Sequence, residues 1–144
     1  MSRLCPASNL CPASKLCPAS NLCPDCAIDE SSHSFKLLYH VDGINVFYSC
    51  PSSATKYEID GILKHFTLLL DHYNCSRSYW KLIFDFNEFG IKHALEINVA
   101  IGIARLINNY SKYLTEIRII NTNIYTYSMM RIVMPFLNNI KIII

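Results

Sequence analysis

The sequence lacks an excess of charge of either sign. It has 13 lysine and arginine residues against 11 aspartate and glutamate residues, so its formal net charge is +2. A nucleic-acid-binding domain normally carries a basic stripe that neutralises phosphate groups, and no such stripe is visible along this chain. We therefore expect no nucleic-acid partner.

Long apolar runs are also missing. No apolar run reaches the roughly 18 residues that a membrane-spanning helix needs. Proline and serine interrupt the residues after Arg3, where a signal peptide would have its apolar block. We therefore expect a cytoplasmic protein. In that compartment the seven cysteines are kept reduced, and no disulfide framework is expected.

Glycine is scarce, with four residues in the chain, and none of them belongs to a glycine-rich phosphate-binding loop. Asp85 and His93 have the residue types of an acid–base pair. No nucleophile and no complete set of metal ligands accompanies them in the sequence. We therefore expect a protein that is not an enzyme and that uses no cofactor.

The first part of the chain is a repeat. Residues 4–26 repeat the hexad Leu-Cys-Pro-Ala-Ser-Asn, with Lys15 replacing the asparagine once and Cys-Pro-Asp-Cys at the end. Proline at every sixth residue prevents a continuous helix and removes a hydrogen-bond donor from any strand. We interpret residues 1–34 as a disordered low-complexity tail. Deleting residues 1–30 should then leave the thermal stability nearly unchanged.

Two functional interpretations of the repeat stay open beside this one. Cys23 and Cys26 have the two-residue gap of a zinc knuckle, but Cys50 and Cys75 are isolated, so the second half of a zinc site is missing. This pair is a weak metal candidate, and no bound metal is expected. The cysteine-rich tail could instead be S-acylated and hold the chain on a membrane, although no amphipathic or polybasic segment adjoins it.

Residues 35–144 have the pattern of one α/β domain, a mixed β-sheet covered by helices in the order ββαβαβαβ. Apolar and β-branched runs predict strands at residues 35–40, 44–49, 80–86, 116–121 and 141–144. Helices are expected over residues 57–73, over residues 95–110, and from the candidate N-cap Ser128 to about Met134, where Pro135 follows.

The two long helices differ in pattern. Residues 57–73 carry apolar side chains on one face, and we place His65 and His72 on the other. Because these histidines are seven residues apart, we interpret them as surface residues rather than metal ligands. Residues 95–110 are apolar almost all round, which predicts a central helix with a close contact at Gly102. One flank of this helix either packs in the core or lines an apolar ligand cavity.

Five segments of this domain occur in the order and at the spacing of one family's motifs: Gly43–Val46, Leu82–Asp85, Tyr110–Leu114, Ile117–Asn121 and Met134–Leu137. On these segments the domain resembles the CRAL-TRIO (Sec14-like) lipid-binding family. The family-motif positions are Gly43, Asp85, Tyr110, Asn121 and Pro135. Asn123 stands where the family has proline, and residues 111–113 replace its Pro-Glu-Arg. The resemblance covers residues 35–144 and lacks the family's preceding helical lobe and its C-terminal gate region.

This resemblance implies a non-catalytic module that binds a hydrophobic lipid between the sheet and its helices. The candidate lining residues, which are also ordinary core residues, are Phe84, Phe86, Ile119, Met129, Met130 and Phe136. The alternative is a protein-interaction domain that kept the fold and lost the lipid cavity. A transient membrane contact and a protein partner both stay open. The fold prediction requires Phe84 and Ile119 to lie on adjacent strands of one sheet.

Overall fold

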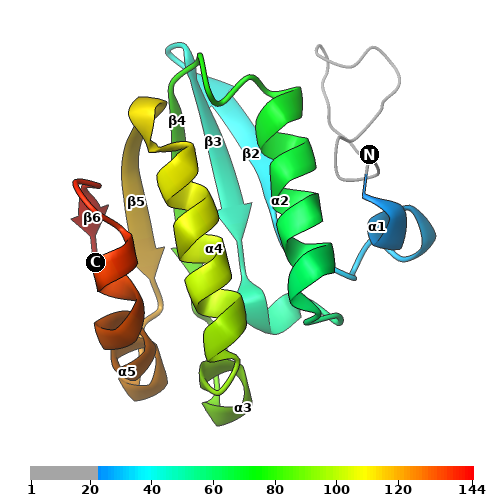
Figure 1. Ribbon diagram of the computed structural model, residues 1–144, viewed down its shortest axis with the longest axis vertical. Helices are drawn as coiled ribbons and strands as arrows, with labels where there is room; N and C mark the ends of the chain where they lie inside the picture. The colour runs from blue at the N-terminus through cyan, green and yellow to red at the C-terminus, as the bar shows by residue number, and fades with distance from the viewer. Residues whose placement is uncertain (1–22) are drawn as a thin grey trace.

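The computed structural model of the protein describes residues 23–144, and these residues form an α/β domain around a five-stranded sheet (Figure 1). The strands lie in sequence order: β2 (Lys36–Val41), β3 (Ile44–Ser49), β4 (Trp80–Asp85), β5 (Leu114–Ile120) and β6 (Ile142–Ile143). Strand β2 is antiparallel to β3, and the remaining neighbours are parallel. The predicted mixed sheet is confirmed, and so is the pairing of Phe84 with Ile119 across β4 and β5.

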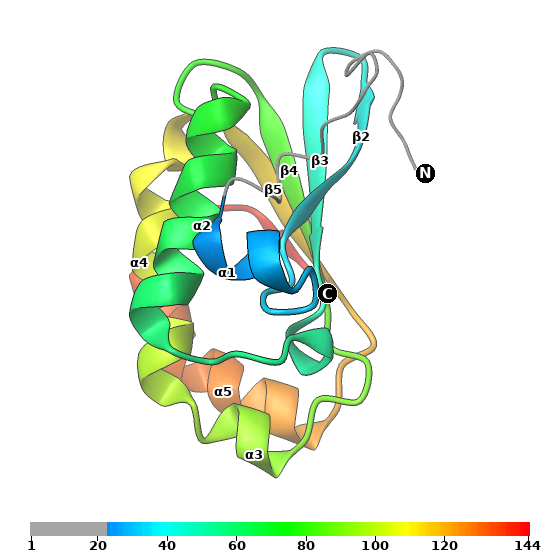
Figure 2. The same cartoon turned by 90° about the vertical axis from the view of Figure 1, so that its right-hand side faces the viewer.

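The strand order decides where the helices lie. The described helices are α1 (Pro24–Ile28), α2 (Ile59–His72), α3 (Ile91–Ala94), α4 (Ile97–Asn109) and α5 (Ile124–Val133). Each parallel crossover moves one strand along the sheet in the same direction. Because such crossovers share one hand, the helices that connect the strands lie on the same face of the sheet. Figure 2 shows α2, α4 and α5 together on one face of the sheet. The opposite face carries no helix of the described part of the chain.

The hairpin between β2 and β3 is tighter than expected. Val41 pairs directly with Ile44, so the loop contains only Asp42 and Gly43. Both have positive φ angles, 51° and 77°. Two positive φ angles define the type I′ turn, whose twist matches that of the flanking strands, and Asp-Gly is a preferred sequence for it.

The core lies between the sheet and the helices. Phe47, Trp80, Leu82 and Ile117 are fully or almost fully buried on the strands. Helices α2 and α4 approach closely at Gly102, where an added Cβ would lie 2.8 Å from Ile59 Cδ1. The expected close contact at this glycine is therefore present, and it is a contact between helices.

Helix α5 begins earlier than predicted. Asn123 Oδ1 accepts hydrogen bonds from the backbone N–H groups of Tyr125 (2.9 Å) and Thr126 (3.1 Å), which makes Asn123 the N-cap. Ser128 is an exposed residue inside the helix, so the prediction that it is the N-cap is wrong. The helix ends at Val133 because Pro135 follows in a short 3-10 turn, as predicted.

The folded unit begins before residue 35. Residues 23–34 contain α1 and pack beside α2 near the β2 edge (Figure 1), with Ser32 and His33 buried. Backbone N–H groups of Thr55 and Lys56 donate to the carbonyl oxygens of Ser31 (3.0 Å) and Ser32 (2.9 Å). These bonds attach the segment to the loop before α2. The expected tail boundary at residue 34 is therefore wrong, because residues 23–34 belong to the folded unit. The remainder of the expected tail, residues 1–22, lies outside the described residues.

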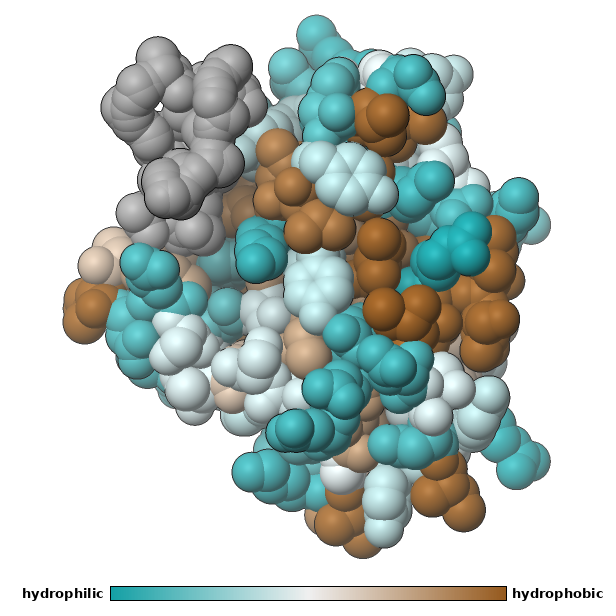
Figure 3. Space-filling view, turned by 180° about the vertical axis from the view of Figure 1, so that it is seen from behind, coloured by the Kyte–Doolittle hydropathy of each residue, from teal (hydrophilic) through white to brown (hydrophobic). Residues whose placement is uncertain are grey.

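The open face of the sheet is mixed in character, as Figure 3 shows. Glu116 lies 3.2 Å from Arg118 Nη2 and 3.8 Å from Lys81 Nζ, which places an ion-pair group in the middle of this face. Leu38, Val41 and Ile120 are 43 %, 45 % and 37 % exposed. Apolar and charged side chains therefore share this face of the sheet.

Candidate functional site

An apolar pocket lies between the sheet and helices α4 and α5. Its volume is about 90 Å³. Phe84, Phe86, Ile119, Met129 and Met130 line it, so five of the six predicted lining residues meet there. The sixth, Phe136, is half-buried against the core, and the Arg105 guanidinium lies 4.9 Å from its ring centroid. It is absent from the lining among the described residues.

The pocket follows from the alternation of side chains on two central strands. Phe84 and Ile119 are direct partners in the β4–β5 register, so both side chains point to the helical face. Opposite them, α4 presents Ala100 and Ala104, whose small side chains leave the hollow open. A smaller hollow of about 50 Å³ extends toward α2 and shares four lining residues with the pocket: Pro51, Tyr57, Val99 and Ile103.

The polar members of the lining are Tyr57, His93 and Glu96, and Glu96 is exposed. The Tyr57 hydroxyl donates to the Pro51 carbonyl oxygen (2.9 Å), and burial raises the pKa of Tyr57. His93 Nδ1 accepts from the Gly90 N–H (2.9 Å), and burial lowers the pKa of this imidazole. Tyr57 and His93 are neutral at pH 7 and bonded to the protein, so the lining between them offers mainly apolar contact.

Asp85 ties together the ends of three strands. Its carboxylate accepts hydrogen bonds from the hydroxyl of Tyr48 on β3 (2.6 Å), from Asn121 Nδ2 after β5 (2.8 Å) and from the Asn87 N–H (3.0 Å). Burial alone would raise the pKa of Asp85, but these donors outweigh it and lower the pKa. Because Asp85 and His93 each bond to other groups, the geometry gives Asp85 a structural role.

The other family-motif positions also lie outside the pocket. Gly43 is at the tip of the hairpin, and Pro135 follows α5. The Tyr110 hydroxyl donates to Asp71 Oδ1 (2.6 Å), and its carbonyl oxygen accepts from Trp80 Nε1 (2.9 Å). Burial and the Asp71 carboxylate raise the pKa of Tyr110 to about 12. This tyrosine connects the C-terminal ends of α2 and α4 to the start of β4.

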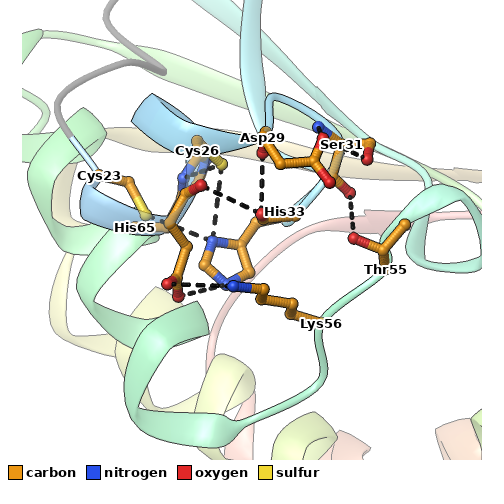
Figure 4. A network of polar contacts seen from close by, with 10 residues as sticks. Cys23, Cys26, Asp29, Ser31, His33, Thr55, Lys56 and His65 are labelled. Atoms are coloured by element: carbon orange, nitrogen blue, oxygen red, sulfur yellow. Dashed lines mark hydrogen bonds and ion pairs between the residues drawn. The ribbon is translucent and has the colours of Figure 1, made fainter.

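A second constellation is formed by Cys23, Cys26, His33 and His65 (Figure 4). One ligand-capable atom from each residue lies within 4.8 Å of all the others, and all four residues are buried. His33 Nδ1 is 3.4 Å from Cys23 Sγ and 3.7 Å from Cys26 Sγ, and His65 Nδ1 is 3.5 Å from Cys26 Sγ. The prediction that His65 is a surface residue is wrong, because its side chain is only 1 % exposed. His72 is exposed, as expected.

Sequence reasoning missed His33 entirely and misplaced His65. The signal for His65 was present, because it lies three residues after Ile62 and four before Leu69, at the edge of the apolar stripe of α2. No comparable signal existed for His33, which sits in a loop. Burial lowers the pKa of both imidazoles and raises the pKa of the Cys26 thiol.

Comparison with known proteins finds no family model that matches the chain and no curated protein that matches it. Among residues 23–144, no helix combines the length and the apolar character that crossing a bilayer requires.

Proposed function

We propose that this protein is a small, non-catalytic module of the CRAL-TRIO type that binds the apolar end of a lipid. The observation that carries the proposal is the pocket between β4, β5, α4 and α5, whose lining includes Phe84, Ile119 and Met130. Methionine side chains are flexible and adapt to ligands of different shape. The free thiols of the described cysteines fit a cytoplasmic setting, which we propose as well.

The size of the pocket limits what it holds. Ligand sites usually measure about 300–1,000 Å³, and this pocket measures about 90 Å³. It therefore accepts about three methylene-sized groups, taking roughly 30 Å³, the share of one water molecule in the liquid, for each. Burying three methylenes contributes roughly 2 kcal/mol, or a 30- to 60-fold gain in affinity.

The test is a series of straight-chain carboxylates of increasing length, titrated into the purified protein. Affinity should rise about fourfold per methylene over the first few carbons and then level off where the pocket is full. Ala100→Leu places a side chain in the pocket and should weaken binding at least tenfold, whereas Ala94→Leu, outside the lining, should not. An affinity that is independent of chain length, or that both variants alter equally, would refute the proposal. Mass spectrometry of an organic extract shows whether a lipid co-purifies.

A protein-interaction domain is the second candidate, and the uncovered sheet face favours it. Parallel strands are normally covered on both faces, yet β3 to β6 carry helices on one face only within the described residues. Ile120 is exposed on β5, the strand that carries Glu116 and Arg118, and Leu38 and Val41 are exposed on the edge strand β2. A clean organic extract together with a stable oligomer or a stoichiometric protein complex would favour this candidate over lipid binding.

A further inference from the structure

We infer that Cys23, Cys26, His33 and His65 form a structural zinc site that fastens the segment before β2 to helix α2. Tetrahedral zinc has sulfur ligands at about 2.3 Å and nitrogen ligands at about 2.0–2.1 Å, so the S···N separation is about 3.6 Å. Three S···N distances in the cluster are 3.4, 3.5 and 3.7 Å. Four side chains from three segments thus surround one point at the spacing that a single ion requires.

The ring of His65 is oriented for coordination by its other nitrogen. His65 Nε2 lies 2.8 Å from the carbonyl oxygen of Phe35, which can only accept a hydrogen bond. Nε2 therefore carries the proton, and the lone pair of Nδ1 faces the cluster. A hydrogen bond from the second ring nitrogen to a backbone carbonyl is the usual way in which a protein orients a zinc-binding histidine.

The ring of His33 also directs Nδ1 at the cluster, but its Nε2 makes no hydrogen bond among the described residues. Its Nδ1 faces the two sulfur atoms, and its Nε2 faces the carboxylate of Asp25 at 3.7 Å. Asp25 also lies 3.4 Å from Lys56 Nζ. Gly61 on α2 permits this approach, because a Cβ at that position would lie 3.0 Å from Asp25 Oδ2. The surroundings therefore hold the His65 ring by a hydrogen bond and place a carboxylate near the His33 ring.

The types of donor atom, and the absence of an open coordination position among them, identify the class of metal site. Two thiolates and two imidazoles in a compact group suit tetrahedral zinc. Cys26 Sγ lies within 3.7 Å of both histidine nitrogens, so the group surrounds one ion and leaves no room for a two-iron cluster. With four buried protein ligands, no position remains for water or substrate, which is the arrangement of a structural site rather than a catalytic one.

The segment needs such an anchor. Helix α1 has five residues, and a helix this short is not stable on its own. Its described backbone attachments are to the loop at Thr55 and Lys56, whereas the metal would join it directly to the middle of α2 through His65. Zinc binding would therefore contribute to the stability of the whole N-terminal edge of the domain.

The test begins with the full-length chain purified without chelator. We expect about one zinc per chain by elemental analysis, with Tm falling by about 10 °C on metal removal and recovering with added zinc. Cobalt added to the metal-free protein should give tetrahedral d–d bands and a thiolate charge-transfer band. Cys23→Ser and Cys26→Ser should each reduce the charge-transfer band by about half, and His33→Ala should alter the d–d bands.

Matched variants control for the loss of any thiol or imidazole. Cys17→Ser changes a cysteine in the same Leu-Cys-Pro context, and His72→Ala changes an exposed histidine of the same helix. Both should keep the zinc content and the cobalt spectrum. The inference is overturned if the folded wild-type chain binds no zinc and shows no thiolate–cobalt band. A Cys23–Cys26 disulfide in place of metal would overturn it as well. The wild-type measurements decide the matter even if a ligand variant fails to fold.

Discussion

The bond between Tyr48 and Asp85 should contribute measurably to stability, because it joins β3 to β4 at the ends of the strands. The hydroxyl donates to Asp85 Oδ2 over 2.6 Å, and both residues are partly buried. A hydrogen bond to a charged group is worth about 1.5–3 kcal/mol. Since Asp85 keeps two other donors when Tyr48 loses its hydroxyl, we expect Tyr48→Phe to cost about 1–2 kcal/mol in the free energy of unfolding.

Asp85→Asn should cost more than Tyr48→Phe. Asparagine lacks the charge that strengthens the bonds from Tyr48, Asn87 and Asn121, so we expect a loss of about 2–3 kcal/mol. The double variant should be less destabilised than the sum of the two single variants, with a coupling energy of about 1 kcal/mol. Urea denaturation followed by tryptophan fluorescence measures all four proteins, because Trp80 is buried in the core.

The pH dependence gives an independent check. The folded-state pKa of Asp85 lies below its ordinary value of 3.8. The stability that this ionisation contributes is therefore fully present above about pH 4 and is lost as the pH falls toward the folded-state pKa. The difference in stability between the wild-type chain and Asp85→Asn should shrink over that interval.

The control for the tyrosine substitution is Tyr39→Phe, since Tyr39 lies half exposed on β2. This change should alter stability by less than about 0.5 kcal/mol. If Tyr48→Phe costs no more than Tyr39→Phe, or if the two changes at Tyr48 and Asp85 add without coupling, the proposed tie between the strands is refuted.

Three further predictions follow from described contacts. Gly102→Ala should leave the free energy of unfolding nearly unchanged, because the helix-propensity gain of about 1 kcal/mol is offset by the 2.8 Å approach of the new Cβ to Ile59 Cδ1. In an Ile59→Val background, which lacks that atom, denaturant unfolding should show the gain. Asn123→Ala should lower the free energy of unfolding by about 1–2 kcal/mol because α5 loses its N-cap, whereas Ser128→Ala should lower it by less than about 0.5 kcal/mol. Equal effects of the two substitutions would contradict the assigned cap. Deleting residues 1–34 should lower the Tm measured by circular dichroism by several degrees more than deleting residues 1–22. Equal Tm values would show that residues 23–34 contribute nothing to thermal stability.

Much of the fold was predictable because its strands are short, continuous apolar runs. The predicted bounds of β3 agree with the structure at both ends, and β4 differs by one residue. The ends of α5 show the limit of such reasoning. Pro135 marks the end of the helix through its own covalent structure. The start depends on which of two polar side chains bonds to backbone N–H groups, and only coordinates show that Asn123 does so.

The pocket was easier to anticipate than the cysteine–histidine cluster. Phe84 and Ile119 follow from strand alternation, because partners on adjacent parallel strands point to the same face. The cluster combines Cys26 on a short helix, His33 in a loop and His65 on α2. Its members come from segments that no local pattern links, so their convergence depends on tertiary packing. A lone Cys-x-x-Cys in a sequence is consistent with a complete site whose other half is distant.

The strict sequential order of the strands also determines which part of the sheet separates most easily from the rest. Each strand from β3 onward contacts only its predecessor and its successor, and β6 contributes just Ile142 and Ile143 beside β5. A sheet of this kind can detach its last strand without breaking any pairing among the others. Amide protons should therefore exchange fastest at the β6 margin and slowest on β4, which pairs with β3 from Trp80 to Phe84 and with β5 from Trp80 to Asp85. Loosening at that margin would uncover the pocket residue Ile117, whose partner on β6 is Ile142.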